Sequence, residues 1–175
     1  EILKKLDADL AIVVAYGHII PKDILELSKN GFINIHASQL PKWRGAAPIQ
    51  RSLINQDKET GISIMKIDEN LDEGPVYNTF STKIKDNENA MDLSIRLANI
   101  AAEKILNCLE DIFNNKAVFY EQDHNKATYA NKIEKSEGKI LWEQGAKEIL
   151  GKINGLYPSP GAWFIFKNER YKILK

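Results

Sequence analysis

Cysteine is nearly missing from this sequence: Cys108 is the only one in 175 residues. A single cysteine excludes an intrachain disulfide and a thiolate metal cluster, and such scarcity is typical of proteins that stay in a reducing compartment. We therefore expect a cytoplasmic protein that is stabilised by its core alone. With 43% hydrophobic residues, a chain of this length buries about two thirds of its unfolded surface, which suffices for one main domain.

Long apolar runs and an excess of one charge are missing too. The longest uninterrupted apolar run extends only from Leu10 to Tyr16, whereas a membrane span requires about 18 residues, so we expect no membrane association. The 24 basic and 24 acidic side chains cancel, which argues against bulk electrostatic binding of nucleic acid but leaves a local basic patch open. HExxH, glycine-rich phosphate loop and GxSxG motifs are absent, so zinc proteases, P-loop NTPases and serine hydrolases lack support.

Strand and helix signals alternate along the first hundred residues, which predicts the α/β class. Residues 10–15 are apolar and β-branched, as in a strand buried on both faces of a parallel sheet. A short helix over 22–29, a strand over 32–36, a loop over 37–45 and a helix over 46–56 follow. Residues 60–67 and 75–84 predict two paired strands, a hairpin at the sheet edge. Apolar residues spaced by three and four predict a long helix over 89–114.

The composition becomes polar and rich in lysine after residue 114. We interpret 1–114 as one domain, 115–139 as an interdomain linker and 140–175 as the start of a second domain. In that last part, a short helix over 145–153 precedes two strand-like segments, WFIF and RYKIL. They indicate a small β domain that is only beginning.

Asn34 and His36 are the first candidates for chemistry. Two residues apart in a strand, they point to one face about 6 to 7 Å apart, while Ile33 and Ile35 point into the core. Ligands of open α/β sheets bind beyond the carboxyl ends of strands, where a histidine shuttles protons and an amide stabilises an oxyanion. An equally weighted alternative is that both side chains only satisfy loop backbone.

Two further segments are ambiguous. Asp68 and Asp72 stand, with neighbouring glutamates, in the turn between two strands, where acidic residues are ordinary turn chemistry. Placed beside His36, Asp72 would favour the imidazolium. Trp43 and Arg44 follow Lys42 in an irregular loop and suit base stacking and phosphate contact, but a packed tryptophan and a surface ion pair are the commoner outcome.

Five strings in order, VVAYGHIIP, NIHASQLPKWRGAAPIQ, ETGISIMKIDENLDEGPVY, TYANKI and YPSPGAW, resemble the methionyl-tRNA formyltransferase family. NIH with a downstream LDEG is shared with folate-dependent formyltransferases that act on glycinamide ribonucleotide or amino sugars, whereas WRGAAPIQ points to the tRNA branch. The resemblance implies a Rossmann-like, mostly parallel sheet with flanking helices, followed by the start of an OB-like β barrel. It also implies strands before residue 1 and a complete barrel after residue 175, so we expect a fragment.

The resemblance further implies transfer of a formyl group from 10-formyltetrahydrofolate to methionine on initiator tRNA, for translation initiation, by a monomer that needs no metal. Asn34, His36 and Asp72 match the catalytic trio of the family. The implied folate contacts are Ser38, Gln39, Leu40, Pro41, Ala15, Tyr16, Gly17, His18, Ile20 and Asp68. Lys42 and Arg44 match a tRNA-facing surface.

Three departures from the family pattern lie outside this trio: Gln39 replaces an apolar residue, Glu73 stands where threonine is common, and YPSPGAW replaces NPWPGAW. Two alternatives remain. One is a formyltransferase for an amino sugar or glycinamide ribonucleotide. The other is a catalytically silent RNA-binding module, which would use these residues: Trp43, Arg44, Lys126, Lys132, Lys135 and Lys139.

Overall fold

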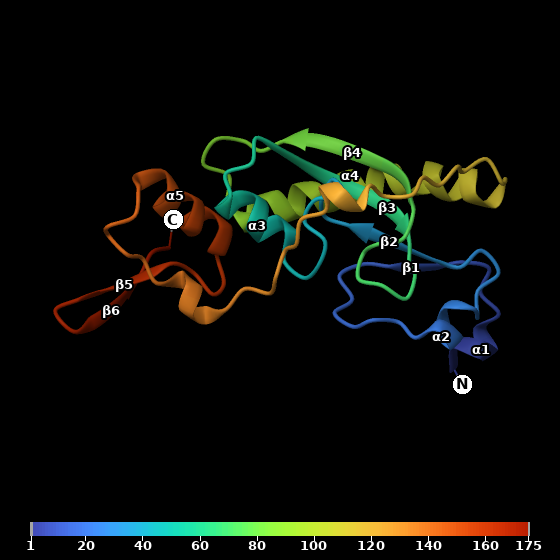
Figure 1. The fold of residues 1–175 in the computed structure, drawn as a ribbon, viewed down its shortest axis with the longest axis horizontal. Coiled ribbons are helices and arrows are strands. Elements are labelled where there is room, and N and C mark those ends of the chain that lie inside the picture. Colours follow the sequence, from blue (N-terminus) through green and yellow to red (C-terminus); the bar gives the residue numbers. More distant parts are fainter. Residues whose placement is uncertain (1, 175) are drawn as a thin grey trace.

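A four-stranded sheet is the centre of the fold in the computed structural model, which describes residues 2–174 (Figure 1). Its strands are β1 (Ala11–Val13), β2 (Phe32–His36), β3 (Glu59–Lys66) and β4 (Val76–Lys83), and they lie in that order. β1 and β2 are parallel, whereas β2–β3 and β3–β4 are antiparallel. The α/β class and the hairpin at the sheet edge are confirmed. Because the hairpin returns without a crossover, parallel pairing among the described strands is limited to β1 and β2.

β1 departs from the expectation of a strand buried on both faces. It has three residues, and Ile12 and Val14 are 46% and 61% exposed. That expectation was wrong because β1 is the edge of the described sheet, away from the residues of the core. The core instead gathers on β2, β3 and the long helix α4.

The helix α4 (Ala90–Phe113) packs across the sheet (Figure 1). Asn89 caps its start, since its side chain accepts a hydrogen bond of 3.0 Å from the backbone N–H of Asp92. One stripe of the helix is buried against isoleucines of β2 and β3, which confirms the predicted amphipathic helix. The buried residues shared by this interface are Leu93, Leu97, Cys108, Ile112, Ile33, Ile62 and Ile64.

Three short helices complete the first part of the chain: α1 (Ile2–Leu6), α2 (Lys22–Leu25) and α3 (Pro48–Ile54). α2 is shorter than the predicted 22–29, because the chain turns before β2 and Gly31 adopts a positive φ of 78°. α3 begins at Pro48, whose fixed φ suits the first helical turn.

Residues 115–139 follow α4 and run back along the sheet (Figure 1). They contain two 3₁₀ turns, η1 (His124–Lys126) and η2 (Lys135–Gly138). Tyr120 forms an isolated bridge with Val76, and Tyr129 forms one with Arg44. The proposed domain limits stay a prediction, but the segment itself is packed against the first domain.

The last part of the described chain holds α5 (Ala146–Leu156) and a hairpin of β5 (Trp163–Phe166) and β6 (Glu169–Lys172). The two strand-like segments of the sequence are therefore paired strands. α5 packs on α3, where Gly151 and Gly155 bring the helices close together. Across residues 2–174, no helix combines the length and hydrophobicity that crossing a membrane would require.

Candidate active site

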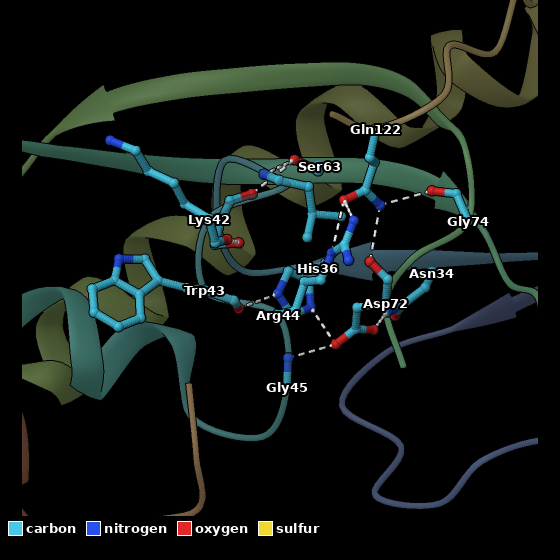
Figure 2. A network of polar contacts seen from close by, with 12 residues as sticks. Asn34, His36, Lys42, Trp43, Arg44, Gly45, Ser63, Asp72, Gly74 and Gln122 are labelled. Atoms are coloured by element: carbon cyan, nitrogen blue, oxygen red, sulfur yellow. Dashed lines mark hydrogen bonds and ion pairs between the residues drawn. The ribbon is translucent and has the colours of Figure 1, made fainter. Parts of the chain in front are cut away.

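The three residues expected to act together do converge. β2 carries Asn34 and His36 on one face, and the β3–β4 turn brings Asp72 to the same place (Figure 2). The Asn34 amide donates to Asp72 Oδ1 over 3.4 Å, and His36 Nδ1 lies 3.6 Å from Asp72 Oδ2. The side chains of His36 and Asp72 are only 6% and 15% exposed, so water screens their interaction weakly.

Asp72 is held by hydrogen bonds from two residues outside the trio. The backbone N–H of Gly45 donates to Asp72 Oδ2 over 2.8 Å, and the Gln122 side-chain amide donates to the Asp72 carbonyl over 2.9 Å. Asp72 itself has a φ of 52°, a left-handed conformation that costs free energy for most residues and less for aspartate. These contacts hold the carboxylate toward His36.

The contact of the second ring nitrogen of His36, Nε2, determines the tautomer of the ring. His36 Nε2 lies 2.8 Å from the carbonyl oxygen of Trp43. A carbonyl only accepts hydrogen bonds, so Nε2 carries a proton and donates it. Nδ1 is therefore the nitrogen that can take up or release a proton, beside the carboxylate of Asp72.

These three residues line a cavity of about 540 Å³, a size suited to a small ligand. Its walls are mostly apolar and include Ile49 of α3 and Leu97 of α4. In a site of this kind the apolar walls bury the ligand, and the few polar groups fix its orientation. Six of the predicted folate contacts line the same cavity: Ala15, Tyr16, Gly17, His18, Ile20 and Asp68.

The other four predicted folate contacts lie outside the lining of this cavity. Ser38 is buried and donates to the Lys42 carbonyl over 2.5 Å, and the Gln39 amide donates to Ser81 over 2.7 Å. Leu40 and Pro41 line a second, shallow groove beside β4. Contact of these four residues with folate stays a prediction.

Lys42, Trp43 and Arg44 have three different environments. Lys42 is exposed, which fits the predicted tRNA-facing surface. The Trp43 indole N–H donates to Asp57 over 2.7 Å. Arg44 is only 1% exposed, so its predicted place on a tRNA-facing surface is wrong. Inside the protein, its guanidinium donates hydrogen bonds to the side chains of Gln122 and Glu73, which are distant in the sequence.

Gln122 is the site residue that sequence reasoning missed. It lies in the segment interpreted as a linker, and its amide contacts the backbone of Asp72 and Gly74 (Figure 2). No periodicity or short motif marks it. The string TYANKI in the same segment was the one local sign that this stretch belongs with the catalytic region. Within residues 2–174, no group of three or more His, Cys, Asp or Glu side chains is arranged to hold a metal ion.

Family models match both parts of the chain: formyl transferase over residues 1–109, and formyl transferase, C-terminal domain, over residues 132–175. The chain belongs to the formyl transferase family. It is 67% identical over 175 residues to a methionyl-tRNA formyltransferase of Pelagibacter ubique, with all of this chain and 56% of that protein aligned. A methionyl-tRNA formyltransferase of Thermodesulfovibrio yellowstonii is 46% identical over 99% of this chain and 56% of its own length. The chain thus spans about half the length of these relatives.

A solved methionyl-tRNA formyltransferase from Clostridium thermocellum matches this chain with a TM-score of 0.80 and 20% identity, over 99% of this chain and 74% of its own length. At such identity the likeness shows the fold alone. It confirms the Rossmann-like formyltransferase fold expected from the sequence.

Proposed function

We propose that this protein transfers a formyl group from 10-formyltetrahydrofolate to the α-amino group of methionine on initiator tRNA. The observation that carries the proposal is the convergence of Asn34, His36 and Asp72 at one end of an apolar cavity. The name of the relatives that are 67% and 46% identical supports methionyl-tRNA as the acceptor. The role in translation initiation, and with it a cytoplasmic location, follows from that acceptor.

In this reaction, the amine nitrogen adds to the formyl carbon, and the bond from that carbon to the folate nitrogen breaks. Negative charge develops on the formyl oxygen as the carbon becomes tetrahedral. An amide has two N–H groups, and Asn34 gives one to Asp72 over 3.4 Å. The other is available to the oxyanion, where a hydrogen bond is strongest once the charge has developed.

His36 moves the proton. With Nε2 committed to the Trp43 carbonyl, Nδ1 accepts the proton that the amine loses and returns it to the departing folate nitrogen, directly or through water. Asp72 lies 3.6 Å from Nδ1 and stabilises the imidazolium between these steps. The proton that the amine loses thus reaches the folate nitrogen, and this transfer requires no metal ion.

The substrates have separate places in this proposal. The pteridine part of the folate occupies the apolar cavity, against residues 15–20 and Asp68. The tRNA backbone meets exposed lysines, whose charge suits phosphate. These lysines are Lys42, Lys126, Lys132, Lys135 and Lys139.

The test is a transfer assay on the complete gene product with a radiolabelled formyl donor. We expect label on methionyl-tRNA and none on an aminosugar nucleotide or glycinamide ribonucleotide. Label on either small acceptor alone would replace the proposal with that activity. A variant His36→Asn should lose transfer while keeping tRNA affinity; binding of tRNA without transfer in the wild type would favour the silent RNA-binding module instead.

A further inference from the structure

The Gln122 side chain uses all of its hydrogen-bonding capacity in the interior. Its oxygen accepts from Arg44 Nε over 3.1 Å and from Arg44 Nη2 over 2.8 Å. Its nitrogen donates to the carbonyl of Asp72 over 2.9 Å and to that of Gly74 over 2.8 Å. Gln122 is 7% exposed. One amide thus joins a buried cation to the backbone on either side of Glu73 (Figure 2).

Arg44 is held from the other side. Its Nη1 contacts Glu73 Oε1 at 3.1 Å and His124 Nδ1 at 3.3 Å. Its backbone N–H donates to Thr128 over 2.9 Å, and its carbonyl accepts from Ala130 over 2.7 Å. A cation that is 1% exposed requires such partners, because an unpaired buried charge is strongly destabilising.

The contacts within the trio cannot fix Asp72 by themselves. At 3.4 and 3.6 Å, the contacts of Asp72 with Asn34 and His36 are longer than the usual range of about 2.7 to 3.2 Å. The shorter contacts of Asp72 come from Gly45 and Gln122, at 2.8 and 2.9 Å. They act on a residue with a φ of 52°, whose backbone relaxes toward other conformations when it is not held.

We propose that Gln122, oriented by Arg44, is a positioning residue that holds the turn 72–74 so that the Asp72 carboxylate stays beside His36. The inference rests on the proposed function. Arg44 lies between the Trp43 carbonyl that orients His36 and the Gly45 N–H that holds Asp72. Gln122 and Arg44 together thus form a clamp on the turn 72–74. This clamp aligns both partners of the proton-transfer pair, and Gln122 belongs to a segment outside the catalytic strands.

Two substitutions test the clamp in the complete gene product. Gln122→Glu keeps the acceptor for Arg44 but loses both donors, and Gln122→Met is neutral and loses every bond. Gln56→Glu makes the same chemical change on an exposed side chain and is the matched control. We expect both Gln122 variants to lower kcat tenfold or more while KM for 10-formyltetrahydrofolate stays within threefold, and Gln56→Glu to match wild type.

Two further measurements separate positioning from unfolding. Titration with 5-formyltetrahydrofolate, an unreactive analogue, should give one site per chain in each variant, so that a lower kcat reflects slower turnover and not fewer folded molecules. Hydrogen exchange should become faster at the amides of residues 70–75. A kcat for Gln122→Met within twofold of wild type, or a loss of binding sites that accounts for its lower kcat, would overturn the inference.

Failure of the proposed function has a different signature. In that case the wild-type protein forms no formylmethionyl-tRNA. Hydrogen exchange at the amides of residues 70–75 then tests by itself whether Gln122 holds the turn. Faster exchange in both Gln122 variants supports the inference, and unchanged exchange overturns it.

Discussion

The backbone N–H of Gly45 donates to the Asp72 carboxylate over 2.8 Å, across a gap of 27 residues in the chain. The donor belongs to a loop and the acceptor to a turn, so neither belongs to a strand of the sheet. The contact uses a rigid main-chain group, which needs no side-chain ordering when a substrate binds. The loop and the turn thereby form one preorganised wall of the cavity.

Asp72→Asn tests the charge of this carboxylate separately from its position. Asparagine tolerates a positive φ, and its oxygen can still accept from Gly45, so we expect a thermal midpoint close to that of wild type. Turnover should fall by about 10²-fold or more, the typical contribution of acid–base catalysis, because the imidazolium of His36 loses its countercharge. Single-turnover formyl transfer is the measurement. Turnover near the wild-type rate in a folded variant would remove Asp72 from the mechanism.

Arg44→Met tests whether this arginine is part of the interior. The substitution removes the partner of Glu73 and leaves the Gln122 oxygen without donors. Leaving that buried amide oxygen without a donor costs about 1–3 kcal/mol, so a midpoint shift of about 5 °C is expected for a chain of this size. Thermal unfolding of Lys42→Met, an exposed neighbour, is the control and should differ little from wild type. Equal midpoints for the two variants would contradict the buried role.

How far the sequence predicts this site depends on the distance between partners. Asn34 and His36 share a face because of the two-residue period of a strand, and that inference needed only five consecutive residues. Arg44 and Gln122 are 78 residues apart, and nothing in their local patterns encodes the contact. The sequence therefore placed Arg44 on the surface, where an isolated arginine in a polar loop is usually found.

The same contrast applies to the fold. Spacings of three and four predicted α4, and alternation predicted the β3–β4 hairpin, because local periodicity determines both. The apolar run at residues 10–15 predicted burial that β1 does not have. Burial depends on which elements cover a strand, and that is a property of the whole sheet.

Glu88 gives a pH-dependent prediction. Burial by itself would raise the pKa of Glu88, but the hydrogen bond from Arg96, the backbone N–H of Lys85 and their charges outweigh it, so the pKa lies below its usual value. Arg96 donates to the Glu88 carboxylate over 2.7 and 2.8 Å. A pKa that is lower in the folded state than in the unfolded state stabilises the fold above the unfolded pKa of about 4.3. That contribution is lost as the pH falls through the folded pKa.

We therefore expect the free energy of unfolding to fall more steeply with acid in wild type than in Glu88→Gln, over the range below about pH 4.3. Urea unfolding at a series of pH values measures the difference. Glu103→Gln is the control, because the Glu103 side chain is 69% exposed and pairs with the adjacent Lys104. If the free energy of unfolding changed with pH in the same way in wild type and Glu88→Gln, the pair with Arg96 would not make the stability of the fold depend on pH.

Gly155→Ala tests the contact of α5 with α3. A Cβ atom at residue 155 would lie 2.6 Å from Ile54 Cγ1 and 2.8 Å from the Gln50 carbonyl oxygen, so the helices must move apart. Alanine is better than glycine inside a helix by about 1 kcal/mol, but overpacking costs about 1–3 kcal/mol, and backbone atoms cannot rotate away. We expect net destabilisation.

Gly145→Ala is the matched control, because the nearest atom to a Cβ there is a flexible carboxylate oxygen of Glu148 at 3.7 Å. Thermal unfolding should show a lower midpoint for Gly155→Ala than for Gly145→Ala. Hydrogen exchange should also become faster in α5 and at the facing residues of α3, since both helices lose the close packing. A Gly155→Ala midpoint at or above wild type would mean that helix propensity outweighs packing and that α5 adjusts on α3 without loss.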